Sequence, residues 1–517
     1  MTYRKNWFDY VLWAVYAGLC IMLLAFVGND LYAYYVGEQL VLLGTFLPFP
    51  VLICLYLAIR QSSQAVRKRY HFSGHFFAIT ESLAVSVSFV FGTILRLKEG
   101  YIAASLYELE MGAPFEAGDY YELAMVRTGG EGFLSVQGIG GLFVKCLRVV
   151  LSFLGNSVEA AILLQVFLQL LAMLFAYLAV RKAAGRLTAC TVLLTLAFSY
   201  SFLCQIDTID LKCFLAALFL AGLYLVISFV KASLTGRNIY GGMPGAFLLG
   251  VALGILCYLE AGCAVLFLFL LGLFTGKSET GVGKKRQIGN LLIVIVGGLA
   301  GLFGAIADAA SASGVVFYQG LLWWADTFFS PDMESVRLLD VIWYSDYPLF
   351  AALFLMASFV VFEFIRRGRE QDISLWLLPC ILVTPAFLID LSVAGFGGIA
   401  LFFWSVMAGL GLKSAILDGQ AELVREKIEG INASVPVTPE PGEEIQTDVS
   451  DPDLPKTEVL EADAQEKPRF IENPLPLPKK HVKRTMDYDY EVSEEDMHFD
   501  VEIDAENDFD QYDGIDL

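Results

Sequence analysis

The sequence predicts an all-α polytopic membrane protein, with about twelve transmembrane helices followed by a disordered acidic tail. Three observations predict this fold class. Of the 517 residues, 56% are hydrophobic and only 17% are charged, and the mean hydropathy is +0.61. Apolar runs of spanning length recur through residues 1–433, and most of the excess acid follows them. Soluble domains carry about 25% charged residues, so soluble, wholly disordered and coiled-coil classes are excluded.

Individual spans follow from the length of each apolar run, because a spanning helix needs about 20 predominantly apolar residues. The runs lie near residues 9–27, 39–59, 76–95, 157–180, 187–204, 211–230, 243–258, 261–275, 288–306, 347–365, 374–391 and 396–414. The first run is longer than the apolar part of a signal peptide, so we expect it to be retained. The runs 243–258 and 261–275 fit either one helix interrupted at Glu260 or two short crossings.

Basic residues predict the orientation of these spans. With the N-terminus inside, the inner segments hold 19 basic residues and the outer segments hold seven. Cytoplasmic loops are rich in Lys and Arg. We therefore expect a multi-pass protein of the cell membrane with both termini in the cytoplasm.

The chain divides into three parts. Residues 1–75 contain two N-terminal transmembrane helices and a basic cytoplasmic loop, and residues 76–433 form the transmembrane core. Residues 434–517 hold 25 acidic and seven basic residues, a net charge of −18 out of −20 for the whole chain. Such a composition is typical of disorder. Because the acid lies in this tail, the net charge says nothing about the core, and we expect no nucleic-acid partner.

The end of the tail has a patterned composition. A basic patch at residues 479–484 precedes an acidic run with regularly spaced aromatic residues, such as Tyr488 and Phe509. Two interpretations stay open: residues 479–517 dock to a cytoplasmic protein, or the tail is simply solvated.

Two outer segments, 96–156 and 307–346, are too long to be plain turns. The first contains an apolar stretch, 133–154, that carries Lys145 and Arg148. We expect an interfacial or re-entrant helix there, because a full crossing would invert every later turn. The second segment is rich in aromatic and acidic residues, including Trp323, Trp324 and Asp326.

The best candidate site is in the first outer segment. All four histidines lie in segments expected to be cytoplasmic, so chemistry at the outer face must use other groups. The candidate cluster consists of Glu116, Asp119, Tyr120, Tyr121 and Glu122, with Arg96 at the end of the preceding span. A carboxylate there can take a proton from a hydroxyl or hold a divalent metal such as Mg or Mn, and arginine suits a phosphate. The alternative is an ordinary polar loop. Glu81, inside a span, fits a functional or a structural role.

The order of features resembles a known family. Asp119-Tyr120-Tyr121-Glu122-Leu123-Ala124 is followed by an amphipathic stretch that ends in Leu154-Gly155-Asn156-Ser157. A long span then leads to Arg181-Lys182-Ala183-Ala184-Gly185-Arg186. This series resembles the polyprenyl-phosphate-sugar-dependent GT-C glycosyltransferases, which include protein O-mannosyltransferases and aminoarabinose transferases. The resemblance implies a GT-C-like core with a large first outer loop.

The resemblance also implies roles for individual residues. Asp119 would be the catalytic base, and Arg96 would contact the donor phosphate. The expected substrate-binding residues are Glu116, Tyr120, Tyr121, Glu122, Gln137, Trp323, Trp324 and Asp326. Trp323 and Trp324 fit either an acceptor wall, because aromatic faces stack on sugar rings, or an interfacial aromatic belt.

Three functions are consistent with the sequence. The first is a glycosyltransferase that moves a sugar, with inversion, from a polyprenyl-phosphate-linked donor to an acceptor on the outer face. The second is a flippase or transporter for lipid-linked oligosaccharides, which predicts internal repeats and charges in mid-span. The third is a catalytically silent scaffold that recruits partners through its tail.

Overall fold

The computed structural model describes residues 7–36, 41–69, 74–109, 118–125, 139–206, 209–235, 241–271, 284–329, 338–367, 376–384 and 399–416. All of them belong to one unit, Met1–Ala421 with Ala505–Leu517. The other unit, Glu422–Asp504, lies outside the described residues, as does the whole expected tail 434–517. Within the described ranges every regular element is helical, so the predicted all-α class is confirmed there.

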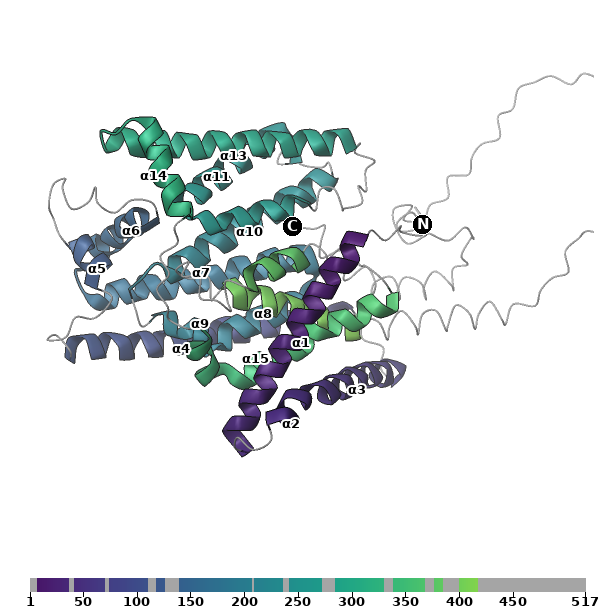
Figure 1. Cartoon of the computed structure of the whole chain (residues 1–517). Coiled ribbons are helices and arrows are strands. Elements are labelled where there is room, and N and C mark those ends of the chain that lie inside the picture. Colours follow the sequence, from purple (N-terminus) through teal and green to yellow (C-terminus); the bar gives the residue numbers. More distant parts are fainter. Residues whose placement is uncertain are drawn as a thin grey trace, which may run out of the picture. The chain divides into compact units, whose positions relative to one another are not determined.

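Figure 1 shows the helices in sequence colours. They are α1 (Trp7–Val36), α2 (Val41–Phe46), α3 (Pro48–Arg69), α4 (Gly74–Leu109), α5 (Gly118–Met125), α6 (Ile139–Leu154), α7 (Val158–Ala184), α8 (Arg186–Phe198), α9 (Tyr200–Leu203), a 3₁₀ turn η2 (Cys204–Ile206), α10 (Lys212–Thr235), α11 (Met243–Leu259), a 3₁₀ helix η4 (Ala261–Leu271), α13 (Lys284–Ala312), α14 (Phe317–Phe329) and α15 (Leu338–Arg367). Residues 376–384 and 399–416 are also helical.

Seven of the described helices are long and apolar enough to cross a membrane. These candidate spans are Tyr10–Ala33, Leu43–Val66, Ala78–Ser105, Val158–Ala184, Lys212–Leu234, Arg286–Ser311 and Ile399–Ile416. The segments Arg186–Phe198 and Tyr200–Ile206, bent by 65°, would make an eighth. The expected number of about twelve is therefore not confirmed. Several of the expected runs form shorter apolar helices, such as Met243–Leu259 and Pro348–Phe362.

The interruption at Glu260 separates two helices. The amide of Glu260 still bonds to the carbonyl of Leu256, at 2.8 Å, as the last bond of α11. η4 then packs against both α10 and α11. A side chain added at Gly298 of α13, which lies beside α11, would meet Phe267 of η4. The chain therefore turns back at this point, and two short helices are present rather than one interrupted helix.

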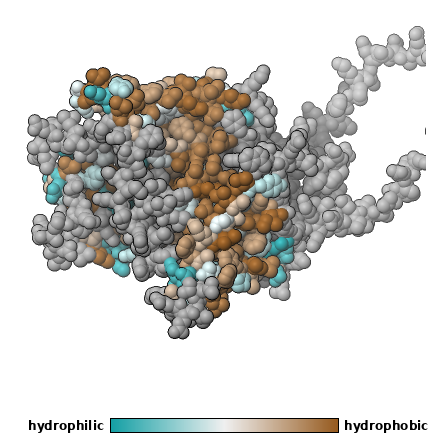
Figure 2. Space-filling view, in the orientation of Figure 1, coloured by the Kyte–Doolittle hydropathy of each residue, from teal (hydrophilic) through white to brown (hydrophobic). Residues whose placement is uncertain are grey.

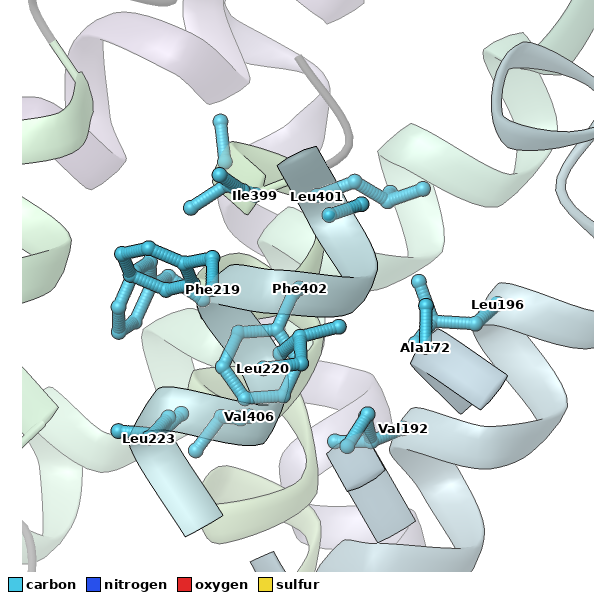
Figure 3. Close-up of a cluster of buried hydrophobic side chains, with 14 of the residues drawn as sticks. Ala172, Val192, Leu196, Phe219, Leu220, Leu223, Ile399, Leu401, Phe402 and Val406 are labelled. Atoms are coloured by element: carbon cyan, nitrogen blue, oxygen red, sulfur yellow. The ribbon is translucent and has the colours of Figure 1, made fainter. Parts of the chain in front are cut away.

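The centre of the bundle is a cluster of buried apolar side chains between four helices. α7 packs extensively on α10, and α4 packs on α7 and α8. Figure 3 shows the buried side chains where they meet residues 399–416. The labelled residues are Ala172 of α7, Val192 and Leu196 of α8, Phe219, Leu220 and Leu223 of α10, and Ile399, Leu401, Phe402 and Val406. Close packing of this kind, rather than water exclusion, is what associates helices inside a bilayer.

α11 and α13 approach each other through glycines. Gly250 and Gly254 face Gly297 and Gly301 across the contact. A Cβ atom at any of the four would overlap a backbone carbonyl oxygen of the opposite helix. Small residues spaced four apart let helix backbones come into direct contact in membranes.

The surface and the N-terminal helices complete the described unit. α1 packs on α15, where the rings of Trp13 and Phe364 stack with centroids 4.3 Å apart. Figure 2 shows large hydrophobic patches on the surface of the bundle. The apolar windows of Ala78–Ser105 and Leu43–Val66 are only 11% and 17% buried. Their exposed apolar side chains fit contact with lipid.

Candidate functional site

The described part of residues 96–156, the first segment expected to lie outside, includes two short helices at one end of the bundle. α4 ends and α7 begins at this end, which we call the loop end, and α5 and α6 lie there between them in sequence (Figure 1). α6 has 16 residues and is not among the candidate spans. This agrees with the expectation that the stretch does not cross the membrane as a full span.

α6 is apolar on two faces. Phe143, Val144 and Leu147 are buried against the bundle, whereas Val149 and Phe153 on the opposite side of the helix are 55% and 83% exposed. A helix with one face on protein and another apolar face exposed fits the boundary between lipid headgroups and acyl chains.

The motif after α6 stops one helix and starts the next. Gly155 has φ +99° and bonds through its amide to the carbonyl of Leu151. Ser157 then caps α7, its hydroxyl accepting from the amide of Ala160 at 3.3 Å. Glycine adopts positive φ without strain and serine is a favoured N-cap, so Leu154-Gly155-Asn156-Ser157 fixes the angle between α6 and α7.

α5 is the element that carries the expected base. Asp119 lies in its first turn, where the helix dipole favours a carboxylate. An isolated helix of eight residues is not stable in water, so α5 depends on its contacts. Tyr120 packs edge-on against Phe143 of α6, with centroids 5.7 Å apart, and Phe143 packs against Phe214 of α10 at 5.6 Å.

The other end of α5 is held by a cation. Arg148 of α6 donates from Nε to the carbonyl of Ala124 at 3.4 Å and from Nη2 to the carbonyl of Leu123 at 3.2 Å. The last four carbonyls of a helix lack intrahelical partners. A positive side chain there also complements the dipole.

Exposure differs among the expected site residues. Tyr120 and Tyr121 are half-buried and Glu122 is exposed. For Asp119 the structure describes the backbone and not the side chain, and Glu116 and Gln137 lie outside the described residues. The structure thus places Asp119, Tyr120, Tyr121 and Glu122 on one anchored helix at the loop end.

Arg96 is in a different environment from the one expected. Its side chain is fully buried inside the candidate span of α4. Nη1 donates to the carbonyls of Gly92 at 3.0 Å and Ala197 at 3.2 Å, and Nη2 donates to the carbonyl of Leu196 at 2.9 Å.

These bonds explain why a cation is placed there. α8 ends at Phe198 and the chain bends by 65°, which leaves carbonyls without helical partners in an apolar environment. The guanidinium satisfies two of them and lies over the ring of Phe202, 5.6 Å from its centroid. Arg96 therefore acts as a structural cation at the end of α8. Its expected contact with a donor phosphate stays a prediction.

Two buried glutamines, neither of them predicted from the sequence to be functional, extend this polar region. Gln169 of α7 donates to the carbonyl of Phe202 at 2.5 Å, and Gln165 donates to the carbonyl of Asp210 at 2.8 Å. Both side chains are fully buried. Together with Arg96, they satisfy the irregular backbone between α8 and α10, which is tolerated at membrane depth only when it is buried in protein. The signal in the sequence was the pair of amides one turn apart in an otherwise apolar span.

The second segment expected to lie outside, 307–346, contains α14, which is at the same end of the bundle as α5 and α6 (Figure 1). Gly314, with φ +66°, turns the chain after α13, and the rings of Phe303 and Phe317 then pack edge-on at 6.2 Å. Trp323, Trp324 and Asp326 all lie on α14. The side chain of Trp324 is half-buried, and those of Trp323 and Asp326 are outside the description.

Among the described side chains, no three His, Cys, Asp or Glu residues come together in a way that could hold a metal ion. The nine cysteines are free thiols. The expected metal ligands, the carboxylates near Asp119, fall outside the described side chains except for Glu122.

Comparisons with known proteins gave matches among solved structures. No protein-family profile matches the chain, and no curated protein matches its sequence. A structure of the oligosaccharyltransferase of Archaeoglobus fulgidus, tethered to an acceptor peptide, aligns with a TM-score of 0.44 and 14% identity over 68% of this chain and 51% of that one. The same enzyme in complex with an inhibitory peptide and a dolichol-phosphate aligns with a TM-score of 0.42 and 12% identity, over 70% and 52% of the two chains.

A third structure, of the complex with Zn and sulfate, has a TM-score of 0.42 and 13% identity, over 68% of this chain and 51% of that one. The present chain thus spans about half the length of these structures.

Proposed function

We propose that the protein is a membrane glycosyltransferase that moves a sugar from a polyprenyl-phosphate-linked donor to a hydroxyl acceptor on the outer face of the membrane. The observation that supports this function most is the set of contacts that hold α5 against α6. A short helix with Asp119 in its first turn is held by aromatic and cationic contacts against an interfacial helix, between two candidate spans.

In the proposed reaction Asp119 acts as general base. It takes the proton of the acceptor hydroxyl while the acceptor oxygen bonds to the anomeric carbon. The bond between that carbon and the phosphate oxygen breaks, its electron pair leaves with the polyprenyl phosphate, and the anomeric centre inverts. The docked helix α5 supplies positioning, because a base displaced by about 1 Å can lose about a hundredfold in rate.

The surroundings of α5 suit the two substrates. The exposed apolar end of α6, at Phe153 and Leu154, would lie at the depth of the donor's phosphate and lipid tail. We place the acceptor between α5 and α14, with Tyr121, Glu122, Gln137 and Trp324 as contacts. In this proposal both termini lie in the cytoplasm of a cell-membrane protein, and residues 479–517 recruit a cytoplasmic partner.

A divalent metal is proposed only as a bound aid to the donor phosphate. Carboxylate oxygens, such as those of Glu116 and Glu122, are the ligands that Mg or Mn prefers. Treatment of the purified protein with EDTA tests this role. Loss of turnover that returns with Mg or Mn supports it, and full turnover in EDTA overturns it.

The test of the function compares three proteins with a pool of polyprenyl-linked sugars. Wild type should transfer or release sugar, and Asp119→Asn, which keeps the shape of the side chain but cannot accept the proton, should lose at least about a hundredfold in kcat while still binding donor. Glu159→Gln, an exposed carboxylate in the first turn of α7 and outside the proposed site, is the control and should keep most of kcat. Full activity in Asp119→Asn would overturn the assignment of the base.

No observation in the described bundle favours the flippase. A translocation path needs polar groups that face a passage through the membrane. The buried side chains of Arg96, Gln165 and Gln169 instead donate to backbone carbonyls of α8, of the segment before α10 and of α9, respectively.

A further inference from the structure

α5 is too short to hold its own position. Its eight residues include four amides at the start and four carbonyls at the end that cannot bond within the helix. Helices below about 12 residues are marginal even with favourable sequences. The order of this helix must therefore come from its tertiary contacts.

Those contacts are of two kinds and lie at opposite ends of α5. Near the start, the ring of Tyr120 packs edge-on against that of Phe143, an apolar contact without a hydrogen bond. At the end, Arg148 bonds to the carbonyls of Leu123 and Ala124. The guanidinium is planar and presents its donors in a fixed fork, so two bonds to successive carbonyls set direction as well as distance.

The charge of Arg148 adds to this geometry. The C-terminal carbonyls of α5 carry the negative end of the helix dipole, and a cation beside them stabilises the helical state. Asp119 lies at the opposite end of the helix, in its first turn. A change at one end of a rigid eight-residue rod of about 12 Å moves the other.

We infer that Arg148 is a positioning residue, which fixes the direction of α5 on α6 and so the place of Asp119 in the reaction. This inference rests on the proposed function for its catalytic part. It does not give Arg148 contact with either substrate.

The test uses the full chain and two measurements that do not depend on each other. Hydrogen–deuterium exchange of the peptide that covers α5 reports whether the helix is formed and docked. Steady-state turnover with the lipid-linked donor reports whether Asp119 is correctly positioned for the reaction. The variants are Arg148→Ala and Arg148→Lys, and Lys145→Ala is the control, because Lys145 is an exposed cation on the same helix.

For Arg148→Ala we expect the amides of residues 122–125 to exchange about tenfold faster, since two bonds and a helix cap are lost. We expect kcat to fall by about ten- to a hundredfold with the KM for the donor unchanged. Arg148→Lys restores the cation without the fork, so it should restore most of the protection and only part of kcat. Lys145→Ala should leave both unchanged.

The outcomes distinguish failure of the positioning role of Arg148 from failure of the proposed function. Unchanged exchange in Arg148→Ala would overturn the inference, as would faster exchange with full kcat. If exchange across all spans rose equally, Arg148 would be a general stability residue and the inference would again be wrong. A wild-type protein with no turnover would overturn the proposed function, and the exchange data would still decide whether Arg148 holds α5.

Discussion

Glu81 of α4 and Arg181 of α7 form an ion pair, with Nε and Oε1 2.9 Å apart. The second carboxylate oxygen lies 3.3 Å from Nε of Arg186 of α8, and the hydroxyl of Tyr177 donates to the first. The carboxylate is 9% exposed, and the two arginines are 23% and 20% exposed. One acid therefore joins three helices at the end of the bundle where α7 turns into α8. This favours the structural role for Glu81 that the sequence left open.

Replacing Glu81 by Gln should destabilise the protein by about 1–3 kcal/mol, because two partly buried cations lose their counter-charge. The measurement is thermal unfolding in detergent. Glu159→Gln, an exposed acid in the first turn of α7, is the control and should shift the midpoint far less. If the two variants behaved alike, the ion pair would contribute nothing specific.

The α11–α13 contact predicts a difference between two glycines of one helix. A Cβ at Gly301 would overlap the carbonyl oxygen of Val251, whereas a Cβ at Gly304 meets nothing within 4 Å. Gly301→Ala should cost about 1–3 kcal/mol through overpacking. Gly304→Ala should be neutral or stabilising by up to about 1 kcal/mol, because alanine favours the helix. Unfolding midpoints of the two variants check this, and a stable Gly301→Ala would contradict the close approach.

The buried position of Arg96 predicts a loss of stability when its charge is removed. Arg96→Met keeps much of the volume but leaves the carbonyls of Leu196 and Ala197 without donors, which should cost about 1–3 kcal/mol. The control is Lys98→Met, an exposed cation two residues later, which should stay within about 0.5 kcal/mol of wild type.

Donor binding by the same Arg96 variant separates the structural role from the role expected from the sequence. A structural cation predicts a lower unfolding midpoint with unchanged donor affinity in the molecules that remain folded. Normal stability with weakened donor binding would instead restore Arg96 as a phosphate contact.

The sequence predicted features that depend on local pattern. The apolar run with Lys145 and Arg148 indicated a helix that does not cross, and α6 has that length and exposure. Hydropathy also located α1, α4, α7 and α10. It could not count the spans, because an apolar run does not show whether its helix bends, as at Ser199, or stops short, as at Glu260.

Pairings across the chain were beyond sequence reasoning. Arg96 and Leu196 are 100 positions apart, and Glu81 and Tyr177 are 96 apart. No periodicity connects such positions, so the bonds from Arg96 to the end of α8 could not be predicted from the sequence. The glycine contact between α11 and α13 could not be predicted either, because small residues in one helix do not indicate which other helix packs against them.

The position of Trp324 on α14 predicts that its substitution changes the KM for the acceptor and not the KM for the donor. If Trp324 forms part of the acceptor wall, Trp324→Ala should raise the KM for the acceptor about tenfold, equal to about 1.4 kcal/mol, with the KM for the donor unchanged. Trp324→Phe keeps an aromatic face and should recover most of that loss. Tyr318→Ala, an exposed aromatic residue on the same helix, is the control. An interfacial belt predicts the reverse pattern, because both substitutions would then weaken anchoring at the membrane surface and neither would change the KM for the acceptor.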